Sequence, residues 1–490
     1  MNLCVKFFQK FHRILLIFFP AVIFFSYHPV ISLGTNEYMN FDLSLVEIWL
    51  VLFALSSIPS LKRLVSFFGW PKLLLSATIP LYCSLSSLWS GNPLRAVLTS
   101  GILWLVVFAV LNIIVDFKSS PTLRPKLLKI LLATSVFFAV ICWVQCILDL
   151  AGVSREFTLL CRGCTYTSFG FPHPNGFAIE PQFMGGLFLA PVLLCFYLLF
   201  LSAPKSRKQK VSLILVTLFL TSTLFLTLSR GAIYSFGLGL VVLFVFCCTK
   251  RFPIIKYKLK SATTAILLVI VAFSIAIVSE GFFAAISPTN DTFFSGITKS
   301  IHQLSLGVID LRSAEFKSDQ SSTHVDSSND SPTSSDAETA AEPKETTIAP
   351  ETSSFSGYVA ESTNVRLSLN SLALGTWSSS PQYIVIGTGL GSAGIAMHTL
   401  HPEDLGPKEI VQNEYVSLLL ELGATGILII AAVIIYALIK IPKNALLLAV
   451  LVSFAFSLLF FSGLPNALYI YLLPVLFATA KNNFFVKNKI

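Results

Sequence analysis

Charge is scarce in this sequence. Charged residues make up 12% of the 490 residues, about half of what a soluble domain carries, and hydrophobic residues make up 54%. A chain of this length cannot hide so much apolar surface inside a water-soluble core. The composition therefore excludes a set of soluble domains and predicts one large membrane domain in contact with lipid.

Groups of metal-binding side chains are also lacking. The chain has nine cysteines, and seven of them lie in or beside apolar runs, where a thiol is typical of a small buried side chain. The other two, Cys161 and Cys164, lie in a short loop, where a disulfide would fit an oxidising compartment. A zinc site would need two more ligands nearby, and the sequence offers none. We therefore expect no metal and no other cofactor.

The basic residues are spread unevenly. Most of the 34 lysines and arginines fall in seven short clusters between apolar runs, and Asp116 is the one acid among them. This is the positive-inside pattern of membrane proteins, so the net charge of +9 indicates contact with anionic lipid head groups and not with nucleic acid. The clusters are residues 6–13, 62–72, 118–129, 205–210, 250–260, 440–443 and 481–489.

Twelve apolar stretches have about the length that a helix needs to cross a ~30 Å hydrocarbon layer. With a cytoplasmic N-terminus and a retained first helix, every basic cluster falls on the cytoplasmic side, and so does the C-terminus. Backbone groups in lipid need internal partners, so we predict an all-α polytopic fold. The predicted spans are residues 13–31, 43–59, 72–88, 95–116, 128–150, 183–202, 211–229, 231–248, 262–281, 415–438, 444–462 and 467–480.

One long loop dominates the chain outside the predicted spans. Residues 282–414 separate nine spans in residues 1–281 from three in residues 415–490, and we expect the loop to be extracytoplasmic. Within it, residues 315–362 are rich in Ser, Thr, Asp, Glu and Pro and almost free of large apolar side chains. Such a composition cannot offset the entropy of ordering, so this insertion is predicted to be disordered.

A polar pair followed by spaced glycines stands at the end of this loop. Gln412 and Asn413 lie just outside a predicted span, and Gly423 and Gly426 follow inside it. Glycines permit close packing of helices, so a helix cap followed by a packing notch is one explanation. Alone, this motif would not predict a functional site.

Two further polar segments are predicted on the same face. Arg230 stands at a corner between two spans, where it would either snorkel at the interface or offer a fixed guanidinium to a phosphate. Residues 170–181, with the sequence GFPHPNGFAIEP, form a loop shaped by proline and glycine that includes His173 and Glu180. Glu180 would be costly to bury without a partner. Residues 389–394 match Gly-x-Gly-x-x-Gly, but no strand and helix frame them, so they predict a turn.

Together these segments resemble the O-antigen ligase and O-antigen polymerase family of bacterial membrane glycosyltransferases. The ligase pattern is His, then Asn, Ser or Gln, nine residues, and Gly-x-x-Gly. This chain matches it except that Gln412 replaces the His. Further likenesses, in chain order, are the segments at residues 88–93, 229–231, 365–374 and 386–391. The likeness extends over residues 85–430.

The resemblance implies a GT-C-like enzyme of the bacterial inner (cytoplasmic) membrane. Such an enzyme transfers a glycan outside the membrane from an undecaprenyl-diphosphate carrier, without nucleotide sugar or metal. A ligase transfers it to lipid A core or another acceptor, and a polymerase transfers it to the next lipid-linked repeat. The partners implied are the lipid-linked donor, a glycan or lipid-linked acceptor, membrane lipids and a chain-length regulator.

The residue types fit that chemistry. The lipid diphosphate gains charge as it leaves, and fixed arginines stabilise such charge. Arg230 and Arg366 are the first candidates and Arg162 is the third. Arg162, His173, Asn175 and Glu414 are expected to bind substrate.

The acceptor hydroxyl needs a base or firm orientation. Because Gln412 cannot take a proton, the base would be another residue, with Glu180 as the first candidate, followed by Glu414, His173 and His401. Gln412 and Asn413 would then orient the acceptor. This departure favours a polymerase over a ligase.

Other classes of protein remain as alternatives. A twelve-helix transporter or flippase of lipid-linked glycans would share the topology but should place polar sites near the membrane midplane. A glycosyltransferase of the shape, elongation, division and sporulation family, a protein O-oligosaccharyltransferase and a non-enzymatic assembly partner also fit the general plan.

Overall fold

The structure is a computed structural model, and it describes most of the chain. The described residues are 3–33, 41–153, 159–160, 169–201, 206–250, 255–288, 291–306, 308–309, 355–403, 405–406, 409–440, 444–464 and 466–478. Arg162, Cys161 and Cys164 lie outside these ranges, as do residues 315–354 of the predicted disordered insertion.

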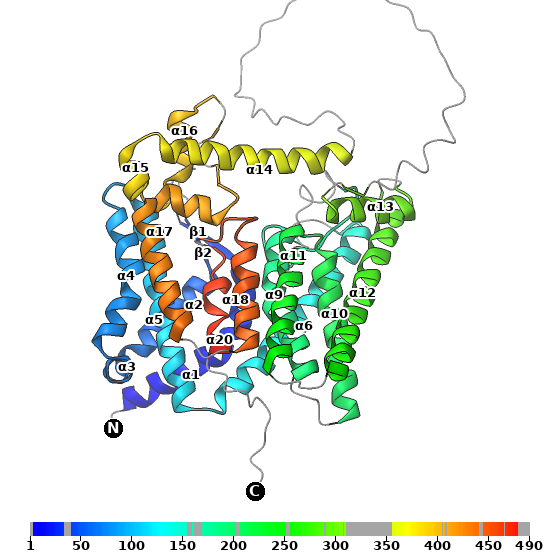
Figure 1. Ribbon diagram of the computed structural model, residues 1–490. Coiled ribbons are helices and arrows are strands. Elements are labelled where there is room, and N and C mark those ends of the chain that lie inside the picture. Colours follow the sequence, from blue (N-terminus) through cyan, green and yellow to red (C-terminus); the bar gives the residue numbers. More distant parts are fainter. Residues whose placement is uncertain are drawn as a thin grey trace, which may run out of the picture.

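The described chain is predominantly helical (Figure 1). Its helices are α1 (Leu3–Val22), α2 (Leu45–Ser57), α3 (Leu61–Phe68), α4 (Trp70–Ser86), α5 (Pro93–Ser119), α6 (Leu123–Leu150), α9 (Pro181–Leu201), α10 (Arg207–Leu226), α11 (Arg230–Lys250), α12 (Ile255–Ile286), α13 (Phe293–Leu304), α14 (Phe355–Ser378), α15 (Pro381–Ile386), α16 (Ala393–Leu400), α17 (Glu414–Lys440), α18 (Ala445–Ser457), α19 (Tyr469–Leu472) and α20 (Val475–Ala478). Two short 3₁₀ helices, Ile23–Phe25 and Ile58–Ser60, extend α1 and join α2 to α3.

Eight of the described helical segments are long and apolar enough to cross a membrane. The protein is therefore a membrane-embedded, polytopic helical protein, as the composition predicted. The eight segments are Phe7–Phe25, Leu45–Phe68, Pro93–Ser119, Leu123–Leu150, Pro181–Leu199, Arg207–Leu226, Ala262–Ile286 and Glu414–Ile439.

These eight segments correspond to eight of the twelve predicted spans. Of the other four, α11 covers its predicted span with 21 residues and α4 covers most of its span with 17, whereas the last two contain shorter helices. α18 has 13 residues, which gives a length of about 20 Å and not the ~30 Å of the hydrocarbon layer. The stretch 467–480 contains two helices of four residues, α19 and α20. Pro474 lies between them, where its missing N–H and its ring disfavour a continuous helix.

A small hairpin also departs from the all-α prediction. Strands β1 (Val30–Leu33) and β2 (Phe41–Ser44) pair antiparallel, with Ile31 opposite Leu43. β1 occupies the end of the predicted span 13–31, so the first helical segment ends at Phe25. The segment Val-Ile-Ser-Leu alternates between the two faces of a strand, and this short pattern was hidden within the apolar run.

Helix α14 lies across one end of the bundle, opposite the end where α1 begins (Figure 1). α13, α15 and α16 lie at the same end, so the described part of the predicted loop 282–414 contains the four helices α13 to α16. α14 begins at Phe355, and residues 355–362 are thus helical although the composition predicted disorder as far as 362. The end of the bundle with α14 is called the α14 end below.

Helix α9 is the central helix. It packs against α10, α11 and α18, and its side chains from Met184 to Phe196 are almost completely buried. Gly185 allows Ala232 of α11 to approach, and Gly186 allows Tyr469 to do so. The start of α9 at the α14 end is therefore held in place by several other elements, which is how it can position a site.

Candidate functional site

The first turn of α9 joins two predicted catalytic residues. The Gln182 amide donates to Glu180 Oε2 over 2.7 Å, and Arg366 Nη2 of α14 donates to Gln182 Oε1 over 3.5 Å. Burial raises the pKa of Glu180, and the Arg366 guanidinium offsets part of this rise. A carboxyl group and a guanidinium from segments far apart in the sequence thus share one polar network.

The loop before α9 is anchored at several points. Gln145 of α6 bonds both backbone groups of Gly176, over 2.7 and 2.8 Å. Ser287 donates to the Gly170 carbonyl over 2.6 Å. Asn175 uses its amide to bond the Ala178 carbonyl over 2.6 Å. These bonds fix the loop that leads into Glu180, and they give Asn175, predicted to bind substrate, a structural contact within the loop.

His173 pairs with a carboxylate that sequence reasoning missed. His173 Nδ1 lies 3.3 Å from Glu280 Oε1, and both side chains are buried. The rings of Phe169 and Phe171 pack edge-on against the imidazole. Glu280 lies within a predicted span, and a single acid in a long apolar run gave no signal of a partner more than a hundred residues away.

Arg230 begins α11 directly after a tight corner. α10 ends at Leu226, Leu228 adopts a φ of 45°, and the Arg230 side chain is buried. A Cβ added to Gly231 would lie 2.8 Å from Cβ of Phe460, so glycine is needed for this close approach. The predicted corner therefore exists, and it packs against both the first turns of α9 and the segment after α18.

Glu414 anchors that segment. Its Oε2 accepts hydrogen bonds from Ser462 Oγ at 2.8 Å, Gly463 N at 2.5 Å and Leu464 N at 3.3 Å. Its backbone N–H donates to the Leu458 carbonyl over 2.9 Å. The carboxylate thus satisfies backbone donors of residues 458–464, called the 458–464 loop below.

The residues before Glu414 have different environments. Asn413 Oδ1 accepts from Tyr415 N over 3.1 Å, so Asn413 caps α17 as the simpler explanation predicted. Gln412 is half-buried, and its Oε1 has no hydrogen-bond partner among the described residues.

The 458–464 loop links the predicted segments to one another. Phe460 contacts Gly231 at the corner, and Phe461 packs edge-on against Phe183 in the first turn of α9. Because the loop also holds Glu414, it brings three predicted polar segments to one place. Its sequence, LLFFSGL, is largely apolar, and its first five residues fall in the predicted span 444–462, so its role was not predicted.

The glycine-rich segment forms a structural joint. Gly423 breaks the helical conformation of α17, with a φ of 63°. The break releases backbone carbonyls, and Thr388 N and Gly389 N donate to those of Leu420 and Glu421 over 2.9 and 2.8 Å. Tyr82 donates to the Leu422 carbonyl over 2.9 Å. The Gly-x-Gly-x-x-Gly segment therefore begins in a turn whose backbone N–H groups bond the carbonyls that the kink in α17 leaves free.

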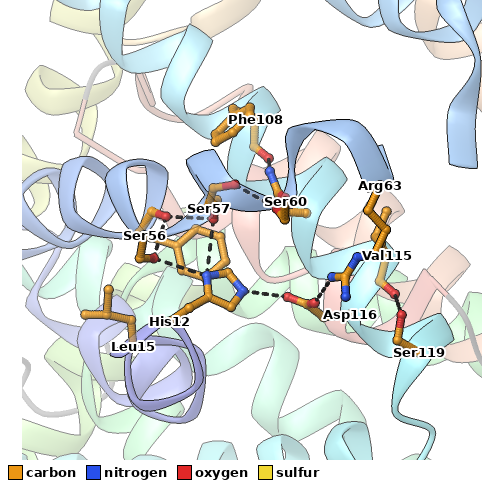
Figure 2. Close-up of polar contacts among 12 residues, drawn as sticks. His12, Leu15, Ser56, Ser57, Ser60, Arg63, Phe108, Val115, Asp116 and Ser119 are labelled. Atoms are coloured by element: carbon orange, nitrogen blue, oxygen red, sulfur yellow. Dashed lines mark hydrogen bonds and ion pairs between the residues drawn. The ribbon is translucent and has the colours of Figure 1, made fainter. Parts of the chain in front are cut away.

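A second polar cluster lies away from these segments (Figure 2). Asp116 of α5 accepts from His12 Nε2 over 2.8 Å and from Arg63 Nη2 over 2.5 Å. His12 Nδ1 lies 3.1 Å from Ser56 Oγ and 3.2 Å from Ser57 Oγ. We call this cluster the Asp116 clasp. It explains why one acid occurs among the basic clusters, because it joins α1, α3 and α5.

The structure thus gathers Glu180, Arg366, Arg230 and Glu414 around the start of α9, and His173 lies in the loop that precedes it. His401 ends α16. Among the described residues, no group of three or more His, Cys, Asp or Glu side chains is placed to hold a metal ion. Comparison with protein-family models, curated proteins and solved structures finds no match to this chain.

Proposed function

We propose that the protein is a glycosyltransferase that polymerises or transfers lipid-linked oligosaccharide repeats on the outer face of a bacterial inner membrane. The supporting observation is the meeting of Arg366, Glu180 and the Arg230 corner around the first turns of α9. The motifs that resemble the O-antigen polymerase and ligase family are far apart in the sequence, and these residues come from three of those segments.

In the proposed topology the chain crosses the membrane twelve times in a GT-C-like arrangement, with both termini cytoplasmic. The last two crossings combine the short helices α18, α19 and α20 with non-helical segments. The basic clusters support this topology through the positive-inside rule. The α14 end then faces outward, and the Asp116 clasp lies at the cytoplasmic side with Arg63 and Lys62.

The proposed reaction uses one carboxylate and two guanidinium groups. The acceptor hydroxyl oxygen attacks the anomeric carbon of the donor sugar, and its proton passes to Glu180. The bond to the carrier oxygen breaks, and the polyprenyl diphosphate leaves with the electron pair. Arg230 and Arg366 stabilise the charge that develops on the diphosphate. The raised pKa of Glu180 suits a base because proton affinity increases with pKa.

A transporter of lipid-linked glycans is the alternative from another class. Such a carrier is expected to hold its substrate near the membrane midplane. Glu180, Arg230 and Glu414 instead stand at or next to the first residues of helices at the α14 end. This distribution favours chemistry at one face.

The proposal is tested by profiling surface and lipid-linked glycans after deletion of the gene. Complementation uses wild type, Arg230→Ala, Arg366→Ala and Glu180→Gln, with membrane levels of each variant measured in parallel. A polymerase predicts single repeats after deletion and failure of both arginine variants to restore long chains. Full-length polymer left on the carrier would instead identify a ligase. Unchanged glycans would contradict the proposal and favour the transporter.

A further inference from the structure

An apolar groove runs along the membrane-spanning part of α11. Ile233, Phe236, Gly237 and Leu240 line one wall. Their spacing places them on one face of the helix, one to three turns after Arg230. The groove has a volume of about 330 Å³, which lies within the usual range of small-ligand sites.

The opposite wall is α12, and the floor is α10. Val269, Ile270 and Phe273 line the α12 wall. Phe225 of α10 forms the floor, and its ring packs edge-on against Phe273 at 5.4 Å and Phe236 at 6.3 Å. α11 packs mainly on α9 and α18, whereas α12 packs mainly on α10 and α13, so the two walls stand apart.

The residues that line the groove favour an apolar ligand. Every lining residue is apolar or glycine, so the groove offers no partner to a sugar or a peptide backbone. Ile270 is 54% exposed on a helix that is long and apolar enough to span the membrane, so the groove is open to the lipid side. A hydrocarbon chain suits this surface because it has no polar group to desolvate.

Arg230 supplies the charge at one end of the groove. At 1.5 Å per residue, Ile233 to Leu240 lie about 5 to 15 Å along the helix axis from Arg230. This interval matches one leaflet of a ~30 Å hydrocarbon layer. An anionic head group at Arg230 would therefore place the first part of its tail in the groove.

We infer that this groove holds the polyprenyl chain of the lipid carrier while Arg230 binds its phosphate. The inference rests on the proposed function for the identity of the lipid. It assigns the tail to one defined surface between α11 and α12, with α10 beneath it.

Gly237 allows a direct test. No described atom lies within 4 Å of a Cβ added at Gly237, and Gly237 lines the groove, so Gly237→Leu adds a branched side chain at the groove from an unobstructed Cβ. Gly101 of α5 is the matched control, since an added Cβ there also meets no described atom within 4 Å and the residue lies outside the groove.

The experiment measures binding of undecaprenyl phosphate to the purified full-length chain by native mass spectrometry, with phosphatidylglycerol as competitor. Wild type and Gly101→Leu should retain the prenyl lipid, and Gly237→Leu should weaken its binding by about tenfold or more. Equal binding by Gly237→Leu and wild type would overturn the inference, as would equally effective displacement by phosphatidylglycerol.

The two proposals fail separately. If Gly237→Leu loses the prenyl lipid while gene deletion leaves glycans unchanged, the groove assignment stands and the transferase proposal fails. If deletion shortens the glycans while Gly237→Leu binds the lipid normally, only the groove assignment fails.

Discussion

The α14 end and the Asp116 clasp both contain buried or half-buried charges, but they use them differently. In the clasp, both oxygens of Asp116 and both ring nitrogens of His12 have partners. At the α14 end, Glu414 Oε1 and His173 Nε2 are buried with no hydrogen-bond partner among the described residues.

The difference in hydrogen-bond partners indicates that the clasp stabilises the fold, whereas the α14 end is the candidate site. A buried polar atom without a partner costs about 1–3 kcal/mol, so it persists only where something else is gained. The clasp is complete and explains how α1, α3 and α5 stay together. At the α14 end, Glu414 Oε1 and His173 Nε2 keep hydrogen-bonding capacity that a substrate can use in the proposed function.

The largest loss of stability is expected at the contact between residues 388–389 and the kinked part of α17, called the glycine joint below. Gly389 has a φ of 94°, and a Cβ there would overlap the backbone of Ser90. We expect Gly389→Ala to lower the free energy of unfolding by roughly 3 kcal/mol or more, because the added Cβ would overlap Cα and N of Ser90, which are backbone atoms and cannot rotate away. Thermal unfolding in detergent measures the effect.

Gly375 of α14 is the matched control for the joint. An added Cβ there meets no described atom within 4 Å, and its φ is not positive. Gly375→Ala should be neutral or stabilise the helix by up to about 1 kcal/mol. Equal unfolding temperatures for the two variants would show that the joint is not rigid.

The Asp116 clasp should give a smaller loss of stability and no loss of function. Asp116→Ala removes the carboxylate that binds His12 Nε2 and Arg63, while Ser56 and Ser57 still face His12 Nδ1. The expected cost is about 1–2 kcal/mol because Arg63 is half-exposed. Ser119→Ala, one turn away, removes only a bond to the Val115 carbonyl. Chemical unfolding compares the two variants. If folded Asp116→Ala lost glycan transfer, the claim that the clasp contributes only to stability would be wrong.

The smallest expected effect concerns pH and Glu180. The pKa of Glu180 is raised in the folded state, so the neutral form is favoured there and its contribution to stability is lost as pH rises through the folded pKa. Glu180→Gln resembles the neutral form. It should unfold at the same temperature as wild type at pH 4 and at a higher temperature at pH 8. A variant with the same difference at both pH values would contradict the raised pKa.

Much of the membrane domain followed from sequence because length and apolarity alone define a spanning helix. The kink at Gly423 did not, since it depends on Thr388 and Gly389 meeting carbonyls that only a broken helix exposes. The corner at Arg230 was predicted because the predicted spans 211–229 and 231–248 almost abut there. In the structure Thr227 to Ser229 separate α10 from α11. The partners of Glu180 were not predicted, as Gln182 carries no recognisable motif.

Apolar sequence hid two features that matter to the site. Residues 458–462 fall in the predicted span 444–462, although Ser462 and the following Gly463 donate to Glu414. Glu280 was passed over inside a span, although it faces His173. In both cases the evidence is a tertiary contact between distant segments. Local composition and hydrophobic periodicity therefore could not reveal it.

The most direct test is glycan transfer by the purified chain in liposomes supplied with an undecaprenyl-diphosphate-linked oligosaccharide. Arg366→Ala is compared with wild type and with Arg207→Ala, an exposed arginine at the start of α10. The account predicts longer glycans with wild type and Arg207→Ala, and a rate lower by about 10²-fold with Arg366→Ala at equal folded protein. Absence of transfer by folded wild type, or full activity of Arg366→Ala, would contradict it.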